Sequence, residues 1–304
     1  MSNIRRLGQV FTPSFITEQM LAMRQNFGRV LEPAAGDGAF LRALGDTAIG
    51  IEIDPSYAAR CGARCLDFFD YPMRQKFDTI IGNPPYVRHQ DISRATRQKL
   101  DLSLFDRRSN LYLFFIAKCL HHLRPNGEMI FITPRDFIKA TAAVKLNQLL
   151  YDCGTITDFI DLGDAKIFAE ATPNCAIWRF VKGDFSRRTN NGRQKFIIHQ
   201  GQIVFAQADY TVPFGDVFFV KVGAVSGMDA VFTSDRHGNR DFVYSQTAAT
   251  GKTRKMIYNL NHPFLRRHKN ALSLRRIRAF DKNNWWQWGR AHYQSDLPRV
   301  YVNA

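Results

Sequence analysis

Residues 77–87 read FDTIIGNPPYV, a short apolar and β-branched run followed by two prolines and a tyrosine. The run from Phe77 to Gly82 has the composition of a buried strand. Each proline fixes its own φ and restrains the residue before it, so the chain continues as a stiff, extended loop. We therefore expect Asn83 and Tyr86 just beyond the carboxyl end of a strand, where open α/β sheets bind ligands. Taken alone, the motif is more typical of a strand that ends in a solvated loop.

The first 180 residues alternate short apolar strands with helical stretches, which is the pattern of a parallel sheet covered by helices. Strands are expected at residues 29–32, 48–53, 77–82, 128–132, 156–162 and 176–181. A polar, basic stretch at residues 183–193 predicts a linker. We accordingly divide the chain into a cofactor-binding domain, residues 1–182, and a smaller domain, residues 194–304. The last residues look like a strand that is cut off, so we expect the smaller domain to be truncated.

The net charge of +15 is concentrated in the second part of the chain. Residues 1–181 carry 22 Lys and Arg against 19 Asp and Glu, whereas residues 182–304 carry 20 against 8. A surface that was merely solvated would mix the two signs, so we expect the second part to face a polyanion. No cationic amphipathic helix supports a membrane surface as the partner.

Neither a membrane span nor a metal site is expected. No apolar run approaches the roughly 18 residues of a membrane-spanning helix, and the N-terminus lacks the apolar core of a signal peptide. The five cysteines form no Cys-x-x-Cys pair, and no His lies at zinc spacing from them. These observations favour a cytoplasmic protein with reduced thiols.

Acidic residues follow further predicted strands. The loop Pro33–Gly38 has two glycines, which let the backbone approach a ligand, but it is neither a dinucleotide fingerprint nor a phosphate loop with its lysine. Glu52 ends the next strand, where a carboxylate can accept hydrogen bonds from both hydroxyls of a ribose. Asp67 is then placed to accept one from an adenine amino group. Each carboxylate alone is more often a solvated strand end, but together they indicate a nucleoside site that suits S-adenosylmethionine.

Four segments resemble, in this order, the gamma class of Taq-like N6-adenine DNA methyltransferases: QVFTP at 9–13, LEPAAGDG at 31–38, IEIDP at 51–55 and GNPPY at 82–86. The resemblance extends over nearly the whole chain and continues at residues 110–112, 123–127, 176–180 and 221–227. It implies a Rossmann-like class I S-adenosylmethionine-dependent methyltransferase sheet of the α/β class. It also implies a second, smaller basic domain that recognises double-stranded DNA.

The same resemblance implies roles for individual residues. The residues that it places around the cofactor are Thr12, Glu32, Ala34, Gly36, Glu52, Asp67 and Pro85. Asn83, Pro84 and Tyr86 would handle the target base, and Phe180 would take the family's second stacking position. The alternative for Phe180 is a core residue, as is usual for a phenylalanine on a strand.

The chemistry of the loop agrees with an adenine amine as the substrate. This amine is a poor nucleophile because its lone pair is delocalised into the ring. The side-chain carbonyl of Asn83 and the backbone carbonyl of Pro84 can hold its two N–H bonds and favour a tetrahedral nitrogen. Stacking on Tyr86, worth roughly 1–3 kcal/mol, offsets the cost of flipping the base. No Pro-Cys dipeptide occurs, which argues against cytosine-C5 methylation, and N4-cytosine enzymes more often have serine in place of Asn83.

Residues 252–290 contain 11 Lys and Arg and one acid, Asp281, with three tryptophans among them. This mixture suits DNA phosphates together with stacking or groove packing. The tryptophans fit the core of a small domain equally well. The residues expected to contact phosphates are Lys252, Arg254, Lys255, Arg275, Arg276 and Arg278.

Two other functions stay open at this point. Enzymes that methylate RNA bases or protein glutamine also use Asn-Pro-Pro-Tyr, although the late basic domain favours nucleic acid and the early Phe-Thr-Pro element favours DNA. A catalytically weak DNA-binding or specificity module is the second alternative. We expect a monomeric enzyme that acts alone or beside a cognate restriction endonuclease.

Overall fold

The computed structural model describes residues 10–105, 109–163, 167–168, 174–207, 217 and 223–290. The chain divides into two compact units, Met1–Tyr210 and Thr211–Ala304. In these described ranges no helix is both long and apolar enough to cross a membrane. The strand expected from the final residues, 299–304, lies outside the described residues.

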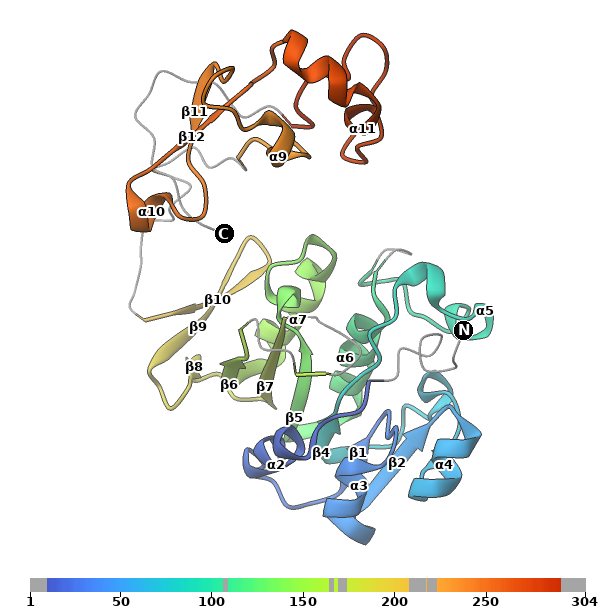
Figure 1. Cartoon of the computed structure of the whole chain (residues 1–304). Helices are drawn as coiled ribbons and strands as arrows, with labels where there is room; N and C mark the ends of the chain where they lie inside the picture. The colour runs from blue at the N-terminus through green and yellow to red at the C-terminus, as the bar shows by residue number, and fades with distance from the viewer. Residues whose placement is uncertain are drawn as a thin grey trace. The chain divides into compact units, whose positions relative to one another are not determined.

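A seven-stranded mixed sheet forms the centre of the first unit, with the strand order β3-β2-β1-β4-β5-β7-β6 (Figure 1). Neighbouring strands from β3 to β5 pair in parallel, and β7 lies antiparallel between β5 and β6. Every strand expected in residues 1–182 is present. The strands are β1 (Val30–Glu32), β2 (Ala48–Glu52), β3 (Arg64–Cys65), β4 (Phe77–Gly82), β5 (Leu123–Pro134), β6 (Gly154–Asp161) and β7 (Cys175–Lys182).

Helices cover both faces of this sheet, because successive strand residues point to opposite sides. On β4, Ile80 packs into a core formed with α6 and α7, whereas Ile81 packs into the opposite core with α2 and α3 (Figure 1). Asn110 caps α6 by accepting a hydrogen bond from the Tyr112 N–H (3.4 Å), which starts that helix after an extended loop. The helices are α2 (Ser14–Ala22), α3 (Ala39–Leu44), α4 (Pro55–Cys61), α5 (Arg94–Arg97), α6 (Leu111–His122) and α7 (Val144–Cys153).

The predicted linker is part of the first unit, which corrects the expected domain boundary. Strands β8 (Arg188–Thr189), β9 (Gln194–His199) and β10 (Gln202–Ala206) form a small antiparallel sheet within that unit. The buried Thr189 hydroxyl donates to the Ile156 carbonyl of β6 (2.5 Å), and the Asn190 N–H donates to the Thr157 carbonyl (2.8 Å). The polar composition of residues 183–193 therefore reflects hydrogen bonds to β6, and the boundary falls after Tyr210.

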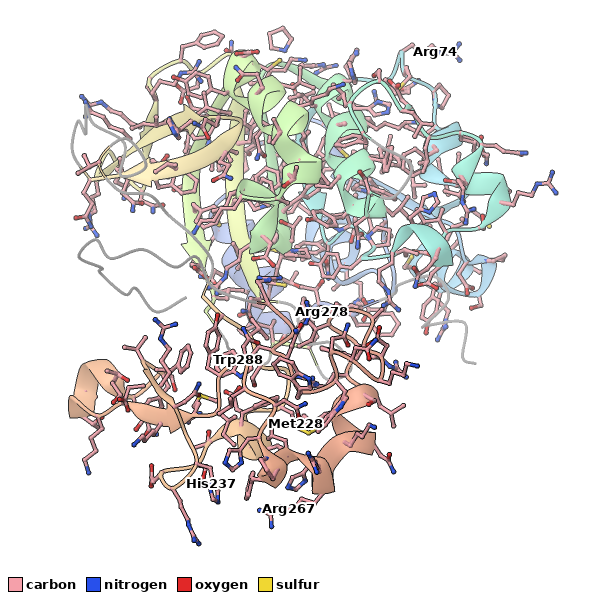
Figure 2. All side chains as sticks on the ribbon, turned by 90° about the horizontal axis from the view of Figure 1, so that it is seen from above. Arg74, Met228, His237, Arg267, Arg278 and Trp288 are labelled. Atoms are coloured by element: carbon pink, nitrogen blue, oxygen red, sulfur yellow. The ribbon has the colours of Figure 1, made fainter. Side chains whose placement is uncertain are left out.

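The second unit has short elements around an aromatic core. They are α9 (Asp229–Phe232), β11 (Arg240–Phe242), α10 (Thr247–Thr250), β12 (Arg254–Met256), the 3₁₀ helix η6 (Pro263–His268) and α11 (Lys269–Ser273). Trp285 and Trp288, the latter labelled in Figure 2, are buried in this core, and Trp286 packs against it. The Trp288 indole donates to the Ile257 carbonyl (2.8 Å). The tryptophans are therefore core residues. The apolar, β-branched composition of residues 217–222 also predicts a strand, but these residues lie outside the described ranges except for residue 217.

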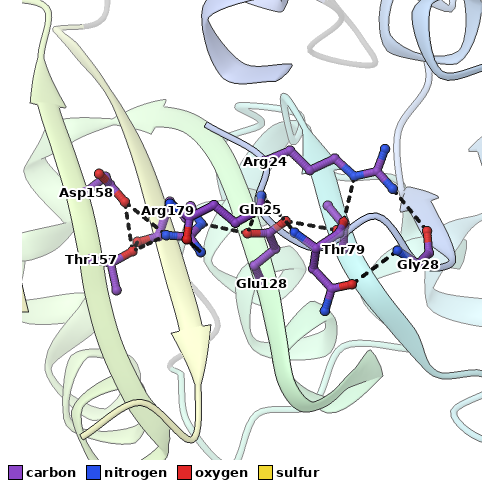
Figure 3. Close-up of polar contacts among 9 residues, drawn as sticks. Arg24, Gln25, Gly28, Thr79, Glu128, Thr157, Asp158 and Arg179 are labelled. Atoms are coloured by element: carbon purple, nitrogen blue, oxygen red, sulfur yellow. Dashed lines mark hydrogen bonds and ion pairs between the residues drawn. The ribbon is translucent and has the colours of Figure 1, made fainter. Parts of the chain in front are cut away.

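A buried ion pair joins β5, β7 and the segment after α2 (Figure 3). The Glu128 carboxylate accepts hydrogen bonds from the N–H groups of Gln25 (3.0 Å) and Asn26 (2.8 Å) and from Nε of Arg179 (2.6 Å). The Arg179 guanidinium also donates to Thr157 Oγ1 (3.0 Å), Asp158 Oδ2 (3.2 Å) and Gln25 Oε1 (2.9 Å). The network thus anchors the N-terminal segment to the sheet.

Replacing Arg179 with Met is expected to reduce the free energy of unfolding by about 3–5 kcal/mol, since it leaves the buried Glu128 carboxylate without its cation. Urea denaturation measures the loss. Arg124→Met is a matched control on β5, the strand of Glu128, because Arg124 pairs with Asp78 with 48% of its side chain exposed; we expect it to cost under about 1 kcal/mol. Equal losses in the two variants would contradict the importance of the buried pair.

Candidate active site

A cavity of about 620 Å³ opens at the carboxyl ends of the parallel strands. Its walls come from the loops after β1, β2, β3 and β4 and from the segment between β4 and α6. This is the edge at which open α/β sheets bind ligands. The sequence-predicted residues that line it are Ala34, Gly36, Glu52, Asp67, Asn83, Pro84 and Pro85.

Glu52 is held by the backbone of two loops. The Gly36 N–H donates to its Oε2 (2.7 Å), and the Asp54 N–H donates to its Oε1 (2.9 Å). Gly36 has φ +56°, and Gly38 has φ +80°, which glycine adopts without strain. A Cβ on Gly38 would also lie 2.4 Å from the Cys61 Cβ. The glycine loop therefore fixes the orientation of the Glu52 carboxylate at the cavity wall.

Asp67 is fixed by a similar set of donors. Its Oδ1 accepts from the Phe69 N–H (3.0 Å), and its Oδ2 accepts from the Thr96 hydroxyl (2.9 Å) and from Lys99 Nζ (3.2 Å). Lys99 also pairs with Asp70 Oδ2 (2.5 Å). A carboxylate has about four lone-pair positions, so Asp67 keeps acceptor capacity toward the cavity.

The side-chain amide of Asn83 has one defined orientation. Its Nδ2 donates to the Val10 carbonyl (3.1 Å) and to Thr12 Oγ1 (3.3 Å). Its Oδ1 is buried and has no hydrogen-bond partner among the described residues. Buried polar atoms are normally paired, so an acceptor without a donor at a cavity wall indicates a place for a ligand N–H.

The next residues hold the loop rigid. In the part of the chain that the structure describes, no hydrogen bond engages the Pro84 carbonyl, whereas the Pro85 carbonyl accepts from the Val87 N–H (3.2 Å). The Tyr86 hydroxyl donates to the Ile132 carbonyl of β5 (2.9 Å), and burial raises the pKa of this phenol well above its ordinary value. Tyr86 therefore stays neutral and anchored at its hydroxyl end.

Three residues depart from the roles that the sequence implied. Thr12 bonds to the Asn83 amide and is not part of the cavity wall. Glu32 is 2% exposed behind the wall, and its Oε2 has no partner within the described ranges. Phe180 is fully buried, and its neighbours on β5 and β6 are Met129 and Ile156, so it cannot stack on a base.

Phe168 contacts the ring of Tyr86. Its ring is 6.4 Å from the Tyr86 ring at an interplanar angle of 68°, and Tyr112 lies 6.0 Å from Tyr86 on an edge-to-face contact. Phe168 lies between β6 and β7. Its position outside any strand is the one sequence feature that could have indicated its place beside Tyr86. Phe168 is 2% exposed and belongs to the core beneath the sheet, so it supports the Tyr86 ring from the side and, like Phe180, has no face open to a base.

Sequence reasoning missed the wall that follows the Asn-Pro-Pro-Tyr motif. Ser93 caps α5 by accepting from the Thr96 N–H (3.0 Å), and the Thr96 hydroxyl faces Asp67. The Ser-x-x-Thr cap was a local signal for this short helix, but nothing in the sequence shows that the helix folds back over the cavity. The residues of this wall are Val87, Asp91, Ile92, Ser93, Arg94, Thr96, Leu111 and Phe115.

The predicted phosphate contacts of the second unit separate into two groups. Lys252, Lys255, Arg276 and Arg278 are exposed, and Arg254 is half-buried against Tyr244. Arg275 is buried, and its guanidinium donates to four backbone carbonyls, so it cannot contact a phosphate. The prediction for Arg275 is therefore corrected: its charge is used within the fold.

Comparisons with known proteins place these features in context. A family model described as an Eco57I restriction-modification methylase matches residues 55–168. Type II methyltransferase M.HincII of Haemophilus influenzae is 31% identical over 188 residues, covering 58% of this chain and 38% of that protein. Type II methyltransferase M.TthHB8I of Thermus thermophilus is 32% identical over 199 residues, covering 59% and 46%. The chain thus spans less than half the length of these relatives.

Solved structures agree on the fold. A modification subunit described as part of a type I restriction enzyme from Vibrio vulnificus has a TM-score of 0.50 at 16% identity, covering 62% of this chain and 49% of that one. A chain of a type I restriction-modification system gives 0.50 at 16% identity over 66% and 49%. The first unit has the class I S-adenosylmethionine-dependent methyltransferase fold. S-adenosylmethionine is the cofactor that this fold and the matched methylase family imply.

Glu32 makes stability depend on pH. Burial is the main cause that raises the pKa of its carboxyl well above the ordinary 4.5, and the nearby Asp37 and Glu52 raise it further. A carboxyl whose pKa is higher in the folded than in the unfolded state favours folding at low pH, and this contribution is lost as pH rises through the folded pKa. Glu32→Gln should therefore be more stable than the unaltered protein at about pH 8, with the difference vanishing near about pH 4.

Urea denaturation at a series of pH values, without cofactor, measures this difference. Glu18→Gln is the control, since Glu18 is exposed on α2 and should leave the pH profile unchanged. A Glu32→Gln profile parallel to that of the unaltered protein would show that Glu32 ionises normally in the fold.

Proposed function

We propose that the chain is a site-specific DNA methyltransferase of the restriction-modification type. It transfers a methyl group from S-adenosylmethionine to the N6 amine of an adenine flipped out of duplex DNA. The observation that carries the proposal is the fixed Asn83 amide, whose oxygen is an unpartnered acceptor at the cavity wall. The similarity to type II methyltransferases supports DNA as the substrate. We also propose a cytoplasmic monomer that acts alone or beside a cognate restriction endonuclease.

The cavity fits S-adenosylmethionine in size and in the chemistry of its walls. Its volume of about 620 Å³ lies within the range of roughly 300–1,000 Å³ that is usual for small-molecule sites. Glu52 would accept hydrogen bonds from the ribose hydroxyls, and Asp67 would accept one from the adenine amine. When bound, this cofactor supplies a methyl group on a positively charged sulfur.

The chain's own contribution to the reaction is to hold the target amine. Asn83 Oδ1 and the Pro84 carbonyl each accept one N–H bond of the amine, which favours a tetrahedral nitrogen with its lone pair directed away from the ring. Neither group removes a proton before transfer, because an amide oxygen is a very weak base. Catalysis then depends on positioning and on fixed dipoles.

The aromatic ring of this loop supports a flipped base as the substrate. The Tyr86 ring is half-buried and tied at its hydroxyl to β5, and in this proposal its face stacks on the purine. Stacking worth roughly 1–3 kcal/mol per base offsets the few kcal/mol needed to unstack the adenine.

Asn83→Ala is expected to abolish methyl transfer while S-adenosylmethionine binding survives, because it removes the amine acceptor and leaves Glu52 and Asp67 intact. Transfer of a tritiated methyl group to duplex DNA, RNA and a protein release factor measures activity, and isothermal titration measures binding. Label in DNA, located at adenine N6, supports the proposal. Label only in RNA or in protein glutamine would show that DNA is not the substrate. Near-normal turnover by Asn83→Ala would contradict the proposed role of Asn83 as the acceptor for the amine.

Thr12→Val keeps the side-chain shape and removes one of the two acceptors that orient the Asn83 amide. We expect kcat to fall about threefold to tenfold, as for the loss of one hydrogen bond, with little change in the KM for S-adenosylmethionine. Steady-state kinetics at saturating DNA separate the two constants. A raised KM with unchanged kcat would instead place Thr12 on the cofactor, as the family resemblance implies.

A further inference from the structure

Leu274 is an apolar side chain with no place in the core of its own unit. It directly follows α11 and is 79% exposed, the highest value among the large apolar side chains that the structure describes. Leu272, two residues earlier, is fully buried, and the following Arg275 is 7% exposed. A single exposed leucine is common on protein surfaces and needs no function. The surroundings of Leu274 set it apart.

Arg275 fixes the backbone on which Leu274 is presented. Its guanidinium donates to the carbonyls of Leu272 (2.7 Å), Ser226 (2.5 Å), Trp285 (2.6 Å) and Gln287 (2.9 Å). These acceptors come from three separate segments of the second unit. Burial lowers the pKa of Arg275 to about 10, so the group stays charged at neutral pH and keeps these bonds. The loop is therefore cross-linked to the fold directly beside Leu274.

Ile277 secures the other end of the same loop. A Cβ on Gly227 would lie 2.2 Å from Ile277 Cδ1, and one on Gly289 would lie 2.6 Å from the same atom. Gly227 also has φ +79°, a conformation that other residues rarely adopt. Because Gly227 and Gly289 lack a Cβ, the Ile277 side chain can pack directly against the backbone of both residues. Arg275 and Ile277 thus anchor residues Leu274–Arg278, which we call the leucine loop. Leu274, Arg276 and Arg278 are exposed on this loop, and Ile277 keeps 39% of its surface exposed.

Two exposed arginines, Arg276 and Arg278, follow the apolar tip in the same loop. In the described part of the chain no partner engages the Arg276 side chain. Arg278, labelled in Figure 2, donates to Gln287 Oε1 (2.7 Å) and lies 5.2 Å from the Phe280 ring centre, so its guanidinium is partly oriented in advance. The single acid of residues 252–290, Asp281, accepts from the N–H groups of Asn283 (2.7 Å) and Asn284 (3.1 Å).

An exposed apolar side chain with two exposed cations in the same loop matches the chemistry of a nucleic-acid groove. Phosphates on either side of a groove attract the arginines, while base faces and thymine methyl groups inside it accept an apolar side chain. Leucine is among the residues that proteins insert between base steps. A protein partner would call for a larger contiguous apolar patch than one leucine.

We propose that the leucine loop inserts Leu274 into a groove of duplex DNA, with Arg276 and Arg278 on the flanking phosphates. This rests on the proposed function, since it takes DNA as the polyanion. The inserted Leu274 side chain adds a contact in the groove that increases the affinity for DNA although the side chain is uncharged. Leu274 therefore contributes to binding independently of salt, whereas each arginine adds to the salt dependence.

The test uses the full chain and a duplex that the unaltered protein selects from a random 30-base-pair pool. Leu274→Gln should weaken binding about tenfold, with the slope of log affinity against log salt unchanged. Leu274→Met should bind within about twofold, since it stays apolar and similar in volume. Arg276→Gln should reduce the slope by about one. Fluorescence anisotropy at several salt concentrations gives all of these values.

The matched control is Leu260→Gln, an apolar residue of the same unit with 41% exposure, which should bind like the unaltered protein. Thermal unfolding should be the same for all variants, because each altered side chain is exposed. Equal affinity of Leu274→Gln and the unaltered protein overturns this inference alone, as does an equal loss in Leu260→Gln. If the unaltered protein selects no duplex, both the proposed function and this inference fail. Preferential loss of binding to a protein partner by Leu274→Gln, with DNA binding intact, also overturns it.

Discussion

The two hydrogen bonds donated by the Asn83 amide decide what the candidate active site can do. An amide offers a donor at one end and an acceptor at the other, and only the acceptor can hold the N–H of an amine. The Val10 carbonyl and Thr12 occupy the donor end, which leaves Oδ1 for the cavity. This orientation requires the N-terminal segment to be in place. Glu128 holds that segment at residues 25–26, on the far side of α2, through a buried carboxylate paired with Arg179. Chemistry at one edge of the sheet therefore depends on an ion pair within it.

The carboxylates of the site follow a common physical rule. Glu52 and Asp67 both accept backbone N–H bonds, so the orientation of each carboxylate is fixed before any ligand arrives. Glu32 lies close by in sequence but is buried with an unpartnered oxygen, and its pKa rises accordingly. The difference lies in the local backbone. Loops with free N–H groups face Glu52 and Asp67, whereas the buried end of β1 supplies too few donors for Glu32.

The sequence predicted the sheet and most of the cavity wall, because these depend on local features: apolar runs, prolines and glycines at strand ends. The family resemblance implied a stacking role for Phe180, but the stated alternative of a core residue agrees with its complete burial, which depends on the neighbouring strands β5 and β6. The sequence misassigned Arg275 because burial of an arginine depends on carbonyls contributed by distant segments. It read residues 183–193 as a linker because polar composition looks the same whether water or a neighbouring strand satisfies it. Thr12 was placed near the site, but its bond to Asn83 spans 71 residues and leaves no local pattern.

The small sheet of β8, β9 and β10 restricts where the second unit could be exchanged for that of another protein. Gly201, at the turn between β9 and β10, fits against α7 so closely that a Cβ would lie 2.2 Å from Val144 Cγ1, and its carbonyl accepts from Asn147 Nδ2 (3.1 Å). The hairpin therefore completes the packing of a helix that covers the catalytic sheet. Exchange of one second unit for another would leave the catalytic unit whole only if the joint fell beyond β10. A fusion point in the polar stretch near residue 183, where composition alone suggests a boundary, would separate β8, β9 and β10 from the unit in which they fold.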